Sequence, residues 1–203
     1  MTGTKLHGSG WQQSVKQVSD ILISVLALVV LSPLLLFVIT RTWLSSKGSI
    51  IYSQERIGYR GKKFTIYKFR SMYSHAEETG PALSFDRDPR ITPWGRTMRK
   101  WRMDELPQLW NIIIGDMSLV GPRPERQYYI DRIKERMPSY DLLLEVKPGL
   151  TSAGMVKFGY ASTIDEMIER IQYDLAYMRN ASLFSDLKIM IHTLLIILSG
   201  KGK

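Results

Sequence analysis

The longest apolar run in the chain covers residues 21–39, nineteen positions without a charged side chain. At helical rise this run is about 28 Å long, close to the roughly 30 Å hydrocarbon core of a bilayer. Ser32 and Pro33 interrupt it. Because Pro33 has no N–H to donate to residue 29, a helix bends there, and the Ser32 hydroxyl can satisfy the freed backbone. The pattern predicts either a proline-kinked transmembrane helix or a helix that enters the membrane and returns.

Basic residues lie on both sides of this run, which suits two helix ends on the same cytoplasmic face. We therefore expect a re-entrant membrane helix over residues 16–46. We expect a flexible tail at residues 1–15 before it and a cytosolic domain at residues 47–203 after it. The flanking cations are Lys5, Lys16, Arg41, Lys47, Arg56, Arg60, Lys62 and Lys63.

Two short runs, residues 50–53 and 64–70, have the composition of strands and are joined by a glycine-containing loop, which predicts a β-hairpin. Alternation along the second strand places Lys68 and Arg70 on one face. Next to Arg56, this cationic pair is suited to holding a diphosphate. The alternative is a solvated edge strand that its lysine protects from further pairing.

The C-terminal part of the chain is predicted to be helical. Thr163 and Glu166 have the spacing of a capping box, and apolar residues recur at helical intervals behind them. The apolar run at residues 189–198 is too short to span a membrane, so it predicts a buried helix or one lying in the membrane interface. The expected fold is α+β and mainly helical, with a short β-hairpin and interfacial amphipathic helices beside the re-entrant membrane helix.

Composition adds a strong positive charge to this picture. The chain has 28 Lys and Arg against 19 Asp and Glu, a net charge of +9. This balance predicts an anionic partner: nucleic acid, acidic lipid headgroups or a phosphorylated substrate. The absence of cysteine excludes disulfides and thiolate metal sites. Neither a G-x-G-x-x-G nor a Walker motif occurs, so the sequence is not typical of a Rossmann or P-loop nucleotide binder.

Two adjacent carboxylates, Asp104 and Glu105, follow a group of cations and begin a stretch with the signature of a helix start. We expect Asp104 to be the N-cap and Gly115 to end the helix, with Pro107 tolerated in the first turn. Free N–H groups at such a terminus attract phosphate oxygens, and the positive surroundings keep a carboxylate ionised. Asp104 is therefore a candidate nucleophile toward phosphorus.

The second carboxylate modifies this expectation, because two close carboxylates resist double ionisation and one of them can act as a base near neutral pH. The simpler alternative is that Asp104 is only a helix cap and Glu105 only a first-turn acid that complements the helix dipole. Downstream, Arg123 lies between two prolines. Its stiff backbone suits bidentate phosphate binding, although a rigid turn with an exposed arginine has the same pattern.

Two segments carry a resemblance to a known family, DELPQLWN at residues 104–111 and GDMSLVGPRP at residues 115–124. They are similar to motifs of the bacterial sugar transferases, the monotopic phosphoglycosyl transferases. QERIG at residues 54–58 and YKFR at residues 67–70 resemble further stretches of that family. The resemblance implies a re-entrant helix broken at a Ser-Pro pair, on the cytoplasmic face of a bacterial inner membrane.

The resemblance also implies an activity, the transfer of a sugar 1-phosphate from a UDP-sugar to undecaprenyl phosphate. UMP is released, and synthesis of a surface glycan such as exopolysaccharide or lipopolysaccharide begins. Asp104 is implied to form a covalent aspartyl-phosphosugar intermediate, with Glu105 as a base or as a group that shapes the field. A Mg²⁺ ion is implied, with Asp104 as its ligand and Asp116 as a second candidate. The implied substrate-binding residues are Arg56, Lys68, Arg70, Arg99, Gln108 and Arg123.

Two other classes of protein fit part of the pattern. A non-catalytic basic peripheral membrane protein that binds anionic lipid accounts for the charge and the apolar run, but not for the two motifs. A nucleic-acid binder accounts only for the charge, so no nucleic-acid partner is expected. The chain departs from the family pattern at Arg102 and Met103, where leucine preceded by a small hydroxyl residue is usual. The sequence leaves open the transferred sugar, the glycan pathway and the oligomeric state, a homodimer included.

Overall fold

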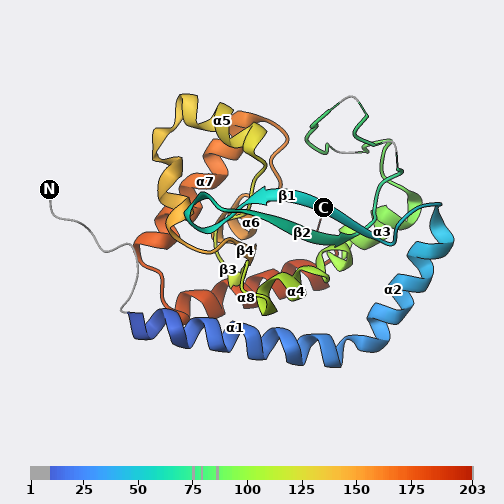
Figure 1. The fold of residues 1–203 in the computed structure, drawn as a ribbon, viewed down its shortest axis with the longest axis horizontal. Coiled ribbons are helices and arrows are strands. Elements are labelled where there is room, and N and C mark those ends of the chain that lie inside the picture. The colour runs from blue at the N-terminus through green and yellow to red at the C-terminus, as the bar shows by residue number, and fades with distance from the viewer. Residues whose placement is uncertain (1–9, 75, 79, 86, 203) are drawn as a thin grey trace, which may run out of the picture.

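Two long helices, α1 (Gly10–Val30) and α2 (Ser32–Ser45), lie along the edge of a body that contains all the other elements (Figure 1). The computed structural model describes residues 10–74, 76–78, 80–85 and 87–202. The body contains β1 (Ile51–Ile57), η1 (Tyr59–Gly61), β2 (Lys63–Phe69), α3 (Pro93–Lys100), η2 (Met103–Glu105), α4 (Gln108–Ile113), β3 (Ser118–Val120), α5 (Gln127–Arg136), η3 (Pro138–Glu145), β4 (Gly149–Thr151), α6 (Ala153–Lys157), α7 (Ile164–Arg179) and α8 (Leu183–Leu198).

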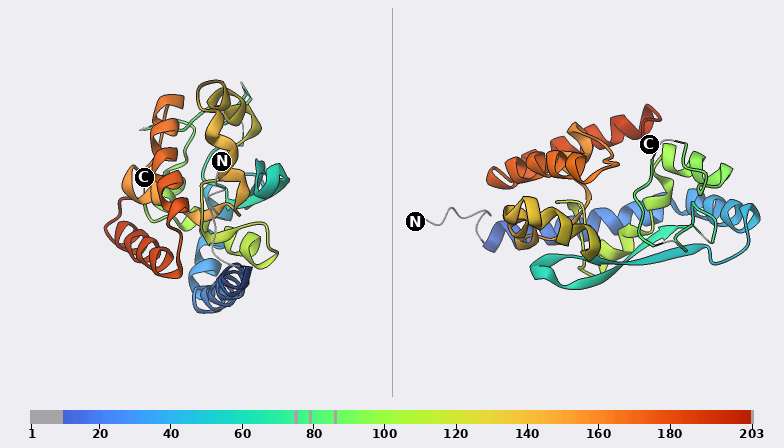
Figure 2. Two further views of the ribbon diagram at one scale, coloured as in Figure 1. Left: turned by 90° about the vertical axis from the view of Figure 1, so that its left-hand side faces the viewer. Right: turned by 90° about the horizontal axis from the view of Figure 1, so that it is seen from above.

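The hairpin and the C-terminal helices lie on opposite sides of the body. Seen from above, β1 and β2 run along one side, and α7 and α8 run along the other (Figure 2). Buried apolar side chains form three clusters. One joins α5, η3 and α7, a second joins β2, α4, β3 and α8, and a third joins α2, β2 and α3. The predicted mainly helical α+β fold with a short hairpin is confirmed.

The break in the apolar run falls where the Ser-Pro pair predicts it. α1 ends at Val30 and α2 begins at Ser32, whose hydroxyl donates to the carbonyl of Val29 at 2.8 Å. Beyond the break, α2 turns away from the line of α1 and rises toward the hairpin (Figure 1). Among the described residues, one helical segment, Gln13–Val30, is long and apolar enough to cross a membrane by length and composition.

The first helix begins before the expected boundary at residue 16. Residues 1–9 of the expected tail lie outside the described residues, but residues 10–15 form the first turns of α1. A tertiary contact holds the helix close to this start. The ammonium group of Lys16 donates to Asp186 at 2.6 Å and lies 3.6 Å from Asp20. This contact fastens the beginning of α1 to α8, and no local pattern in the sequence indicates it.

The first strand of the hairpin is longer than the predicted residues 50–53. The antiparallel register pairs every residue from Ile51 to Ile57 with β2, so that Ile57 lies opposite Lys63. The N–H of Ile57 also donates to the carbonyl of Glu125 at 3.0 Å, which ties the strand to the body. The sequence did not predict the second half of this strand because Gln54 and Arg56 are polar. Their side chains line a cavity.

A second, parallel pairing joins β3 to β4 and was not predicted. A Cβ added to Gly149 would lie 2.1 Å from the backbone nitrogen of Gly121, so the approach of the two chains requires glycine. The N–H of Gly149 donates to the carbonyl of Pro122 at 2.9 Å. The pairing therefore fixes the backbone immediately before Arg123.

The predicted start of α7 is confirmed, because the Thr163 hydroxyl accepts from the N–H of Glu166 at 3.2 Å. The carboxylate of Glu166 accepts from the N–H of Ser162 at 2.5 Å, one residue before the expected donor. The following helix, α8, buries only Asp186 and Ile189 among its residues and leaves most of its apolar side chains exposed. Of the two alternatives for residues 189–198, the buried helix is wrong, because the helix lies at the surface; the membrane interface stays a prediction.

Candidate active site

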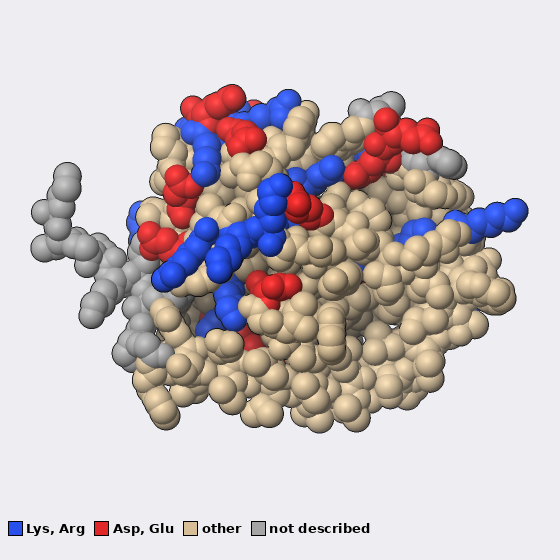
Figure 3. Space-filling model, viewed as in Figure 1, with Lys and Arg blue, Asp and Glu red and all other residues tan. Residues whose placement is uncertain are grey.

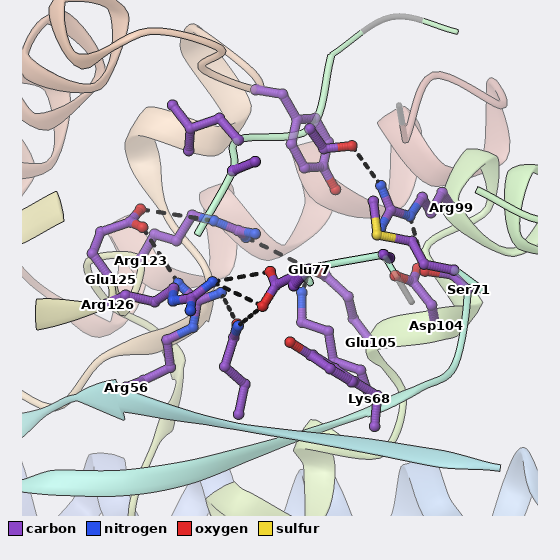
Figure 4. Close-up of a pocket in the computed structure, with 18 of the residues that line it drawn as sticks. Arg56, Lys68, Ser71, Glu77, Arg99, Asp104, Glu105, Arg123, Glu125 and Arg126 are labelled. Carbon is purple, nitrogen blue, oxygen red and sulfur yellow. Dashed lines mark hydrogen bonds and ion pairs between the residues drawn. The ribbon is translucent and has the colours of Figure 1, made fainter. Parts of the chain in front are cut away.

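A cavity of about 270 Å³ opens between the inner face of the hairpin and the segments that follow β2 and β3 (Figure 4). It brings together side chains from parts of the chain that are far apart in sequence. The charged groups come from the hairpin, the segment between β2 and α3, α3, η2, the segment between β3 and α5, and α7. The predicted site residues that line it are Arg56, Lys68, Arg70, Arg99, Asp104, Glu105 and Arg123.

The carboxylate pair lies on a short 3-10 turn, and the expectation that Asp104 is a helix N-cap is wrong. Asp104 lies inside η2, and α4 begins only at Gln108. The N–H groups at the end of this turn donate to carbonyls three residues back, as in a 3-10 helix, and not four. For example, the N–H of Glu105 donates to the carbonyl of Arg102 at 3.2 Å.

The backbone on either side of this turn is also specialised. Arg102, directly before it, adopts a left-handed conformation with φ of 50°. Gly115 ends α4 with φ of 89°, as predicted. Because α4 has only six residues, its N-terminus is a weak source of positive potential. The attraction for phosphate in this cavity comes from side chains instead.

Glu105 is buried among cations. Its Oε1 atom accepts from the Lys68 ammonium at 3.0 Å and lies 3.6 Å from Nη1 of Arg123, and its Oε2 atom lies 3.9 Å from Nη1 of Arg102. Burial alone raises the pKa of a carboxyl group, but these three cations outweigh it and hold the pKa of Glu105 well below its usual range. Glu105 is therefore firmly ionised.

Asp104 is shifted in the opposite direction. Its side chain is buried, and burial together with the negative charge of Glu105 raises its pKa, while Lys68 and Arg99 act against the rise. The expectation that the surroundings favour ionisation of Asp104 is thus reversed. Glu105 receives the cations, and Asp104 becomes the more basic carboxylate of the pair. A more basic carboxylate is the better nucleophile or base once it is ionised.

A buried glutamate organises the arginines on the other side of the cavity. Glu125 accepts from Arg170 at 2.6 Å, lies 3.5 Å from Nη1 of Arg56 and 4.0 Å from Nε of Arg123. The sequence interpretation missed both Glu125 and Arg170. A signal for Arg170 was present, because this charged residue interrupts the apolar face of α7, three positions after the buried Met167.

Three further side chains of the cavity were also missed. The ring of Tyr160 lies 5.4 Å from the guanidinium carbon of Arg102 and 5.6 Å from that of Arg123. Burial raises the pKa of Tyr160 to about 12, so its phenol stays protonated at neutral pH. Glu77, between β2 and α3, pairs with Arg126 at 2.9 Å. No motif in the sequence connects these positions, which meet only in the folded chain.

Two of the predicted substrate-binding arginines, Arg99 and Arg70, donate hydrogen bonds to uncharged groups of the protein. Arg99 donates to the hydroxyls of Ser71 at 2.9 Å and Ser84 at 2.8 Å, at the Asp104 end of the cavity. Arg70 donates to backbone carbonyls at the end of α2, including that of Thr42 at 3.1 Å. A cation at a helix C-terminus satisfies free carbonyls and complements the helix dipole. Arg70 thus connects the cavity wall to α2.

The remaining predicted residues lie elsewhere. Gln108 is buried in α4 and Asp116 lies in the turn between α4 and β3, and neither lines the cavity. Within the described part of the chain, no three or more Asp, Glu, His or Cys side chains are grouped so as to hold a metal ion. Asp104 and Glu105 are nevertheless adjacent hard-oxygen donors, and Oε2 of Glu105 accepts no hydrogen bond from the described residues. This donor set fits a Mg²⁺ ion shared with phosphate groups, not one enclosed by protein alone.

The fold and the site together define a class of protein: a small α+β domain in which a cavity rich in arginine holds two adjacent buried carboxylates, Asp104 and Glu105, joined to a long apolar helix. The chain belongs to the bacterial sugar transferase family, whose model matches residues 11–200.

Three relatives illustrate this membership. The chain is 39% identical over 188 residues to the UDP-N-acetylgalactosamine-undecaprenyl-phosphate N-acetylgalactosaminephosphotransferase of Aeromonas hydrophila, covering 93% of this chain and 44% of that protein. It is 36% identical over 187 residues to the UDP-glucose:undecaprenyl-phosphate glucose-1-phosphate transferase of Klebsiella pneumoniae, covering 91% and 40%. It is 38% identical over 182 residues to the protein of that same name from Caulobacter vibrioides, covering 88% and 67%. The chain spans less than half the length of the first two.

Proposed function

We propose that the protein transfers a sugar 1-phosphate from a UDP-sugar to undecaprenyl phosphate and releases UMP. The observation that carries the proposal is the buried carboxylate of Asp104, the more basic member of its pair, in a cavity lined by cations that suit phosphate oxygens. The names of the relatives, which specify UDP-sugars and undecaprenyl phosphate, support the same reaction.

In the first step, a carboxylate oxygen of Asp104 attacks the phosphorus that carries the sugar. The bond from that phosphorus to the bridging oxygen of the diphosphate breaks, and UMP leaves with the electron pair. The product is an aspartyl phosphosugar. Covalent catalysis of this kind divides a difficult transfer between a soluble and a lipid-bound substrate into two easier ones. Arg123 and Lys68 lie where they can stabilise charge on the phosphate oxygens.

In the second step, an oxygen of undecaprenyl phosphate attacks the same phosphorus. The bond to Asp104 breaks, its electrons return to the carboxylate, and the product is an undecaprenyl diphosphate sugar. The atoms balance without an external proton donor, because each leaving group is an anion. The next transfer begins with Asp104 ionised again.

Glu105 has a different role from Asp104. Its low pKa makes it a poor base near neutral pH, which argues against the role of a base toward the lipid phosphate. Its fixed negative charge instead raises the pKa of Asp104 and holds Lys68 and Arg123 in place. Glu105 therefore sets the electrostatic potential at the carboxylate of Asp104.

A Mg²⁺ ion fits this site as a partner of the substrate. Asp104 would hold it, with Glu105 as the adjacent carboxylate, and it would neutralise charge on the diphosphate. Asp116 lies away from the cavity lining and has no part in this arrangement. The cations of the cavity bind and orient the donor.

We propose further that α1 and α2 form a re-entrant membrane helix on the cytoplasmic face of a bacterial inner membrane. The surface over these helices is almost free of charged side chains in the view of Figure 3, whereas Lys, Arg, Asp and Glu gather over the body. The bend at Ser32 directs α2 back toward the hairpin, and Arg70 joins its end to the cavity wall. This arrangement brings a lipid-bound acceptor to the level of Asp104. The exposed large apolar residues are Trp11, Val18, Leu22, Ile23, Val25, Leu26, Val29 and Val30 of α1, and Leu36, Phe37, Ile39, Trp43 and Leu44 of α2.

The proposed reaction is tested by incubating the purified protein with undecaprenyl phosphate, Mg²⁺ and each of a panel of UDP-sugars, and by measuring UMP. UDP-N-acetylgalactosamine, UDP-glucose and UDP-galactose belong in the panel. We expect UMP release that requires the lipid acceptor for more than one turnover, with one sugar preferred. Binding to anionic vesicles without UMP release from any UDP-sugar would instead favour a non-catalytic peripheral membrane protein.

A further inference from the structure

The carboxylates that face the arginines of the cavity are not held equally. The side chains of Glu105 and Glu125 are about one-twentieth exposed, and each lies within 4.0 Å of three cationic side chains. The side chain of Glu77 is 34% exposed and is paired with one cation, Arg126. Of these three carboxylates, Glu77 is the one that can leave its partner at the lowest cost.

The contact of Glu77 crosses the cavity. Both of its carboxylate oxygens accept from Nη1 of Arg126, at 2.9 and 3.1 Å, and its Oε2 atom lies 3.4 Å from the amide nitrogen of Gln54. Glu77 comes from the segment between β2 and α3, whereas Gln54 is on β1 and Arg126 is the N-cap residue directly before α5. Figure 4 shows the carboxylate directed toward Arg126 and away from its own segment.

We propose that Arg126 is a binding residue for the diphosphate of the donor, and that Glu77 competes with the donor for it. The inference rests on the proposed function and identifies an additional anion subsite of the same cavity. A carboxylate and a phosphate offer a guanidinium the same kind of paired oxygen acceptors, so one N–H group of Arg126 cannot serve both fully. Glu77 therefore lowers the affinity for the donor.

The cost of separating a carboxylate from its cationic partner depends on how exposed the pair is to solvent. A partly exposed ion pair contributes little to stability, whereas removing one partner of a buried pair leaves an uncompensated buried charge and costs several times more. Glu105 and Glu125 are therefore permanent counter-ions, and Glu77 is a replaceable one. The described side chains that line the cavity include seven cations and four carboxylates, so a surplus of positive charge remains for a diphosphate. Neutralising Glu77 increases that surplus and frees Arg126.

The test compares Glu77→Gln with Glu78→Gln. The second variant makes the same charge change at the next residue of the segment, which is exposed. We expect Glu77→Gln to lower the KM for the UDP-sugar by about two- to fivefold, the range that a pair of this kind corresponds to, with kcat little changed. Glu78→Gln leaves KM within about twofold of the wild type. A structural role for Glu77 would instead raise KM or lower kcat.

A double-mutant cycle identifies the partner. Arg126→Gln should raise KM, and the gain from Glu77→Gln should disappear when Arg126 is already replaced. Melting temperatures confirm that each variant is folded. If the wild type releases UMP and Glu77→Gln has an unchanged or higher KM, the proposed competition is wrong.

Direct binding separates this inference from the proposed reaction. Calorimetric titration with UDP measures affinity without turnover, and we expect Glu77→Gln to bind UDP more tightly than the wild type. Tighter binding without UMP release from any UDP-sugar would support the anion subsite and contradict the proposed reaction. Equal or weaker binding by Glu77→Gln would overturn the subsite, whatever the turnover.

Discussion

At the residue scale, Asp104 and Glu105 are neighbours in sequence whose surroundings differ. Glu105 lies among Lys68, Arg102 and Arg123, which keep its pKa low, whereas burial and the charge of Glu105 raise the pKa of Asp104. The two carboxylates therefore have separate roles. Asp104 provides a basic oxygen, and Glu105 provides a fixed charge.

This division predicts the pH dependence of the Glu105→Gln variant. The replacement removes a negative charge that raises the pKa of Asp104 and releases cations that lower it, so the pKa of Asp104 falls. Because Asp104 is active when ionised, the rate rises with pH through that pKa, and the acidic limb of the rate profile should move to lower pH. The measurement is initial UMP release as a function of pH.

The control for that prediction is Glu55→Gln, which removes the same charge from an exposed ion pair with Lys63 outside the cavity. Its acidic limb should coincide with that of the wild type. An acidic limb that stays in place or moves to higher pH in Glu105→Gln would show that the two carboxylates are not coupled as described.

The site residues that the sequence predicts lie in local motifs, whereas those it does not predict have interaction partners far away in the sequence. Asp104, Glu105, Lys68, Arg99 and Arg123 lie in or near local motifs, and the structure brings them to one cavity. Residues of the cavity such as Arg170 and Glu77 have partners 45 and 49 positions away, which no local pattern indicates. The direction of the pKa shifts could not be predicted either, because it depends on burial and on which carboxylate receives the cations.

At the element scale, local signals predicted elements that local interactions stabilise. The Thr163 cap and the apolar spacing behind it located α7, and the Ser-Pro pair located the break between α1 and α2. The prediction failed where tertiary contacts decide. The segment Met103–Glu105, which packs against β2 and α3, forms a 3-10 turn in place of the expected helix start, and pairing with β2 extends β1 through a polar stretch.

The packing of α3 against the end of β2 gives a prediction at this scale. A Cβ added to Gly95 would lie 1.9 Å from the carbonyl oxygen of Ser71, so Gly95→Ala forces α3 away from that backbone. We expect a loss of about 2–3 kcal/mol in the free energy of unfolding, measured by denaturant titration in detergent.

Thr97→Ala, at an exposed position of the same helix, is the matched control and should change that free energy by less than about 0.5 kcal/mol. Because Arg99 donates to the Ser71 hydroxyl, the shift of α3 in Gly95→Ala should also reduce turnover. Wild-type stability of Gly95→Ala would mean that the helix and the strand end pack less closely than the structure indicates.

At the scale of the whole molecule, the apolar surface of α1 and α2 and the charged surface of the body lie on different parts of the molecule (Figure 3). The cavity wall is joined to α2, because Arg70 donates to the carbonyl of Thr42 near the end of that helix. A re-entrant helix therefore predicts that both ends of the apolar segment are on the same side of the membrane as the catalytic domain.

Cysteine labelling in sealed vesicles tests this topology, and the chain has no native cysteine to interfere. Ser9→Cys, before α1, and Glu135→Cys, an exposed position on α5, should react with an impermeant maleimide from the same side. Reaction of the two cysteines from opposite sides would mean that the apolar segment spans the membrane.

The covalent intermediate on Asp104 is the central claim. The most direct measurement uses UDP-sugar labelled at the phosphate next to the sugar, with undecaprenyl phosphate withheld, and follows radioactivity that remains with the denatured protein. The account predicts retained label in the wild type and in Asp131→Asn, a matched change on the exposed surface of α5, and no label in Asp104→Asn. An active wild type that retains no label, or an Asp104→Asn variant that retains it, would contradict the account.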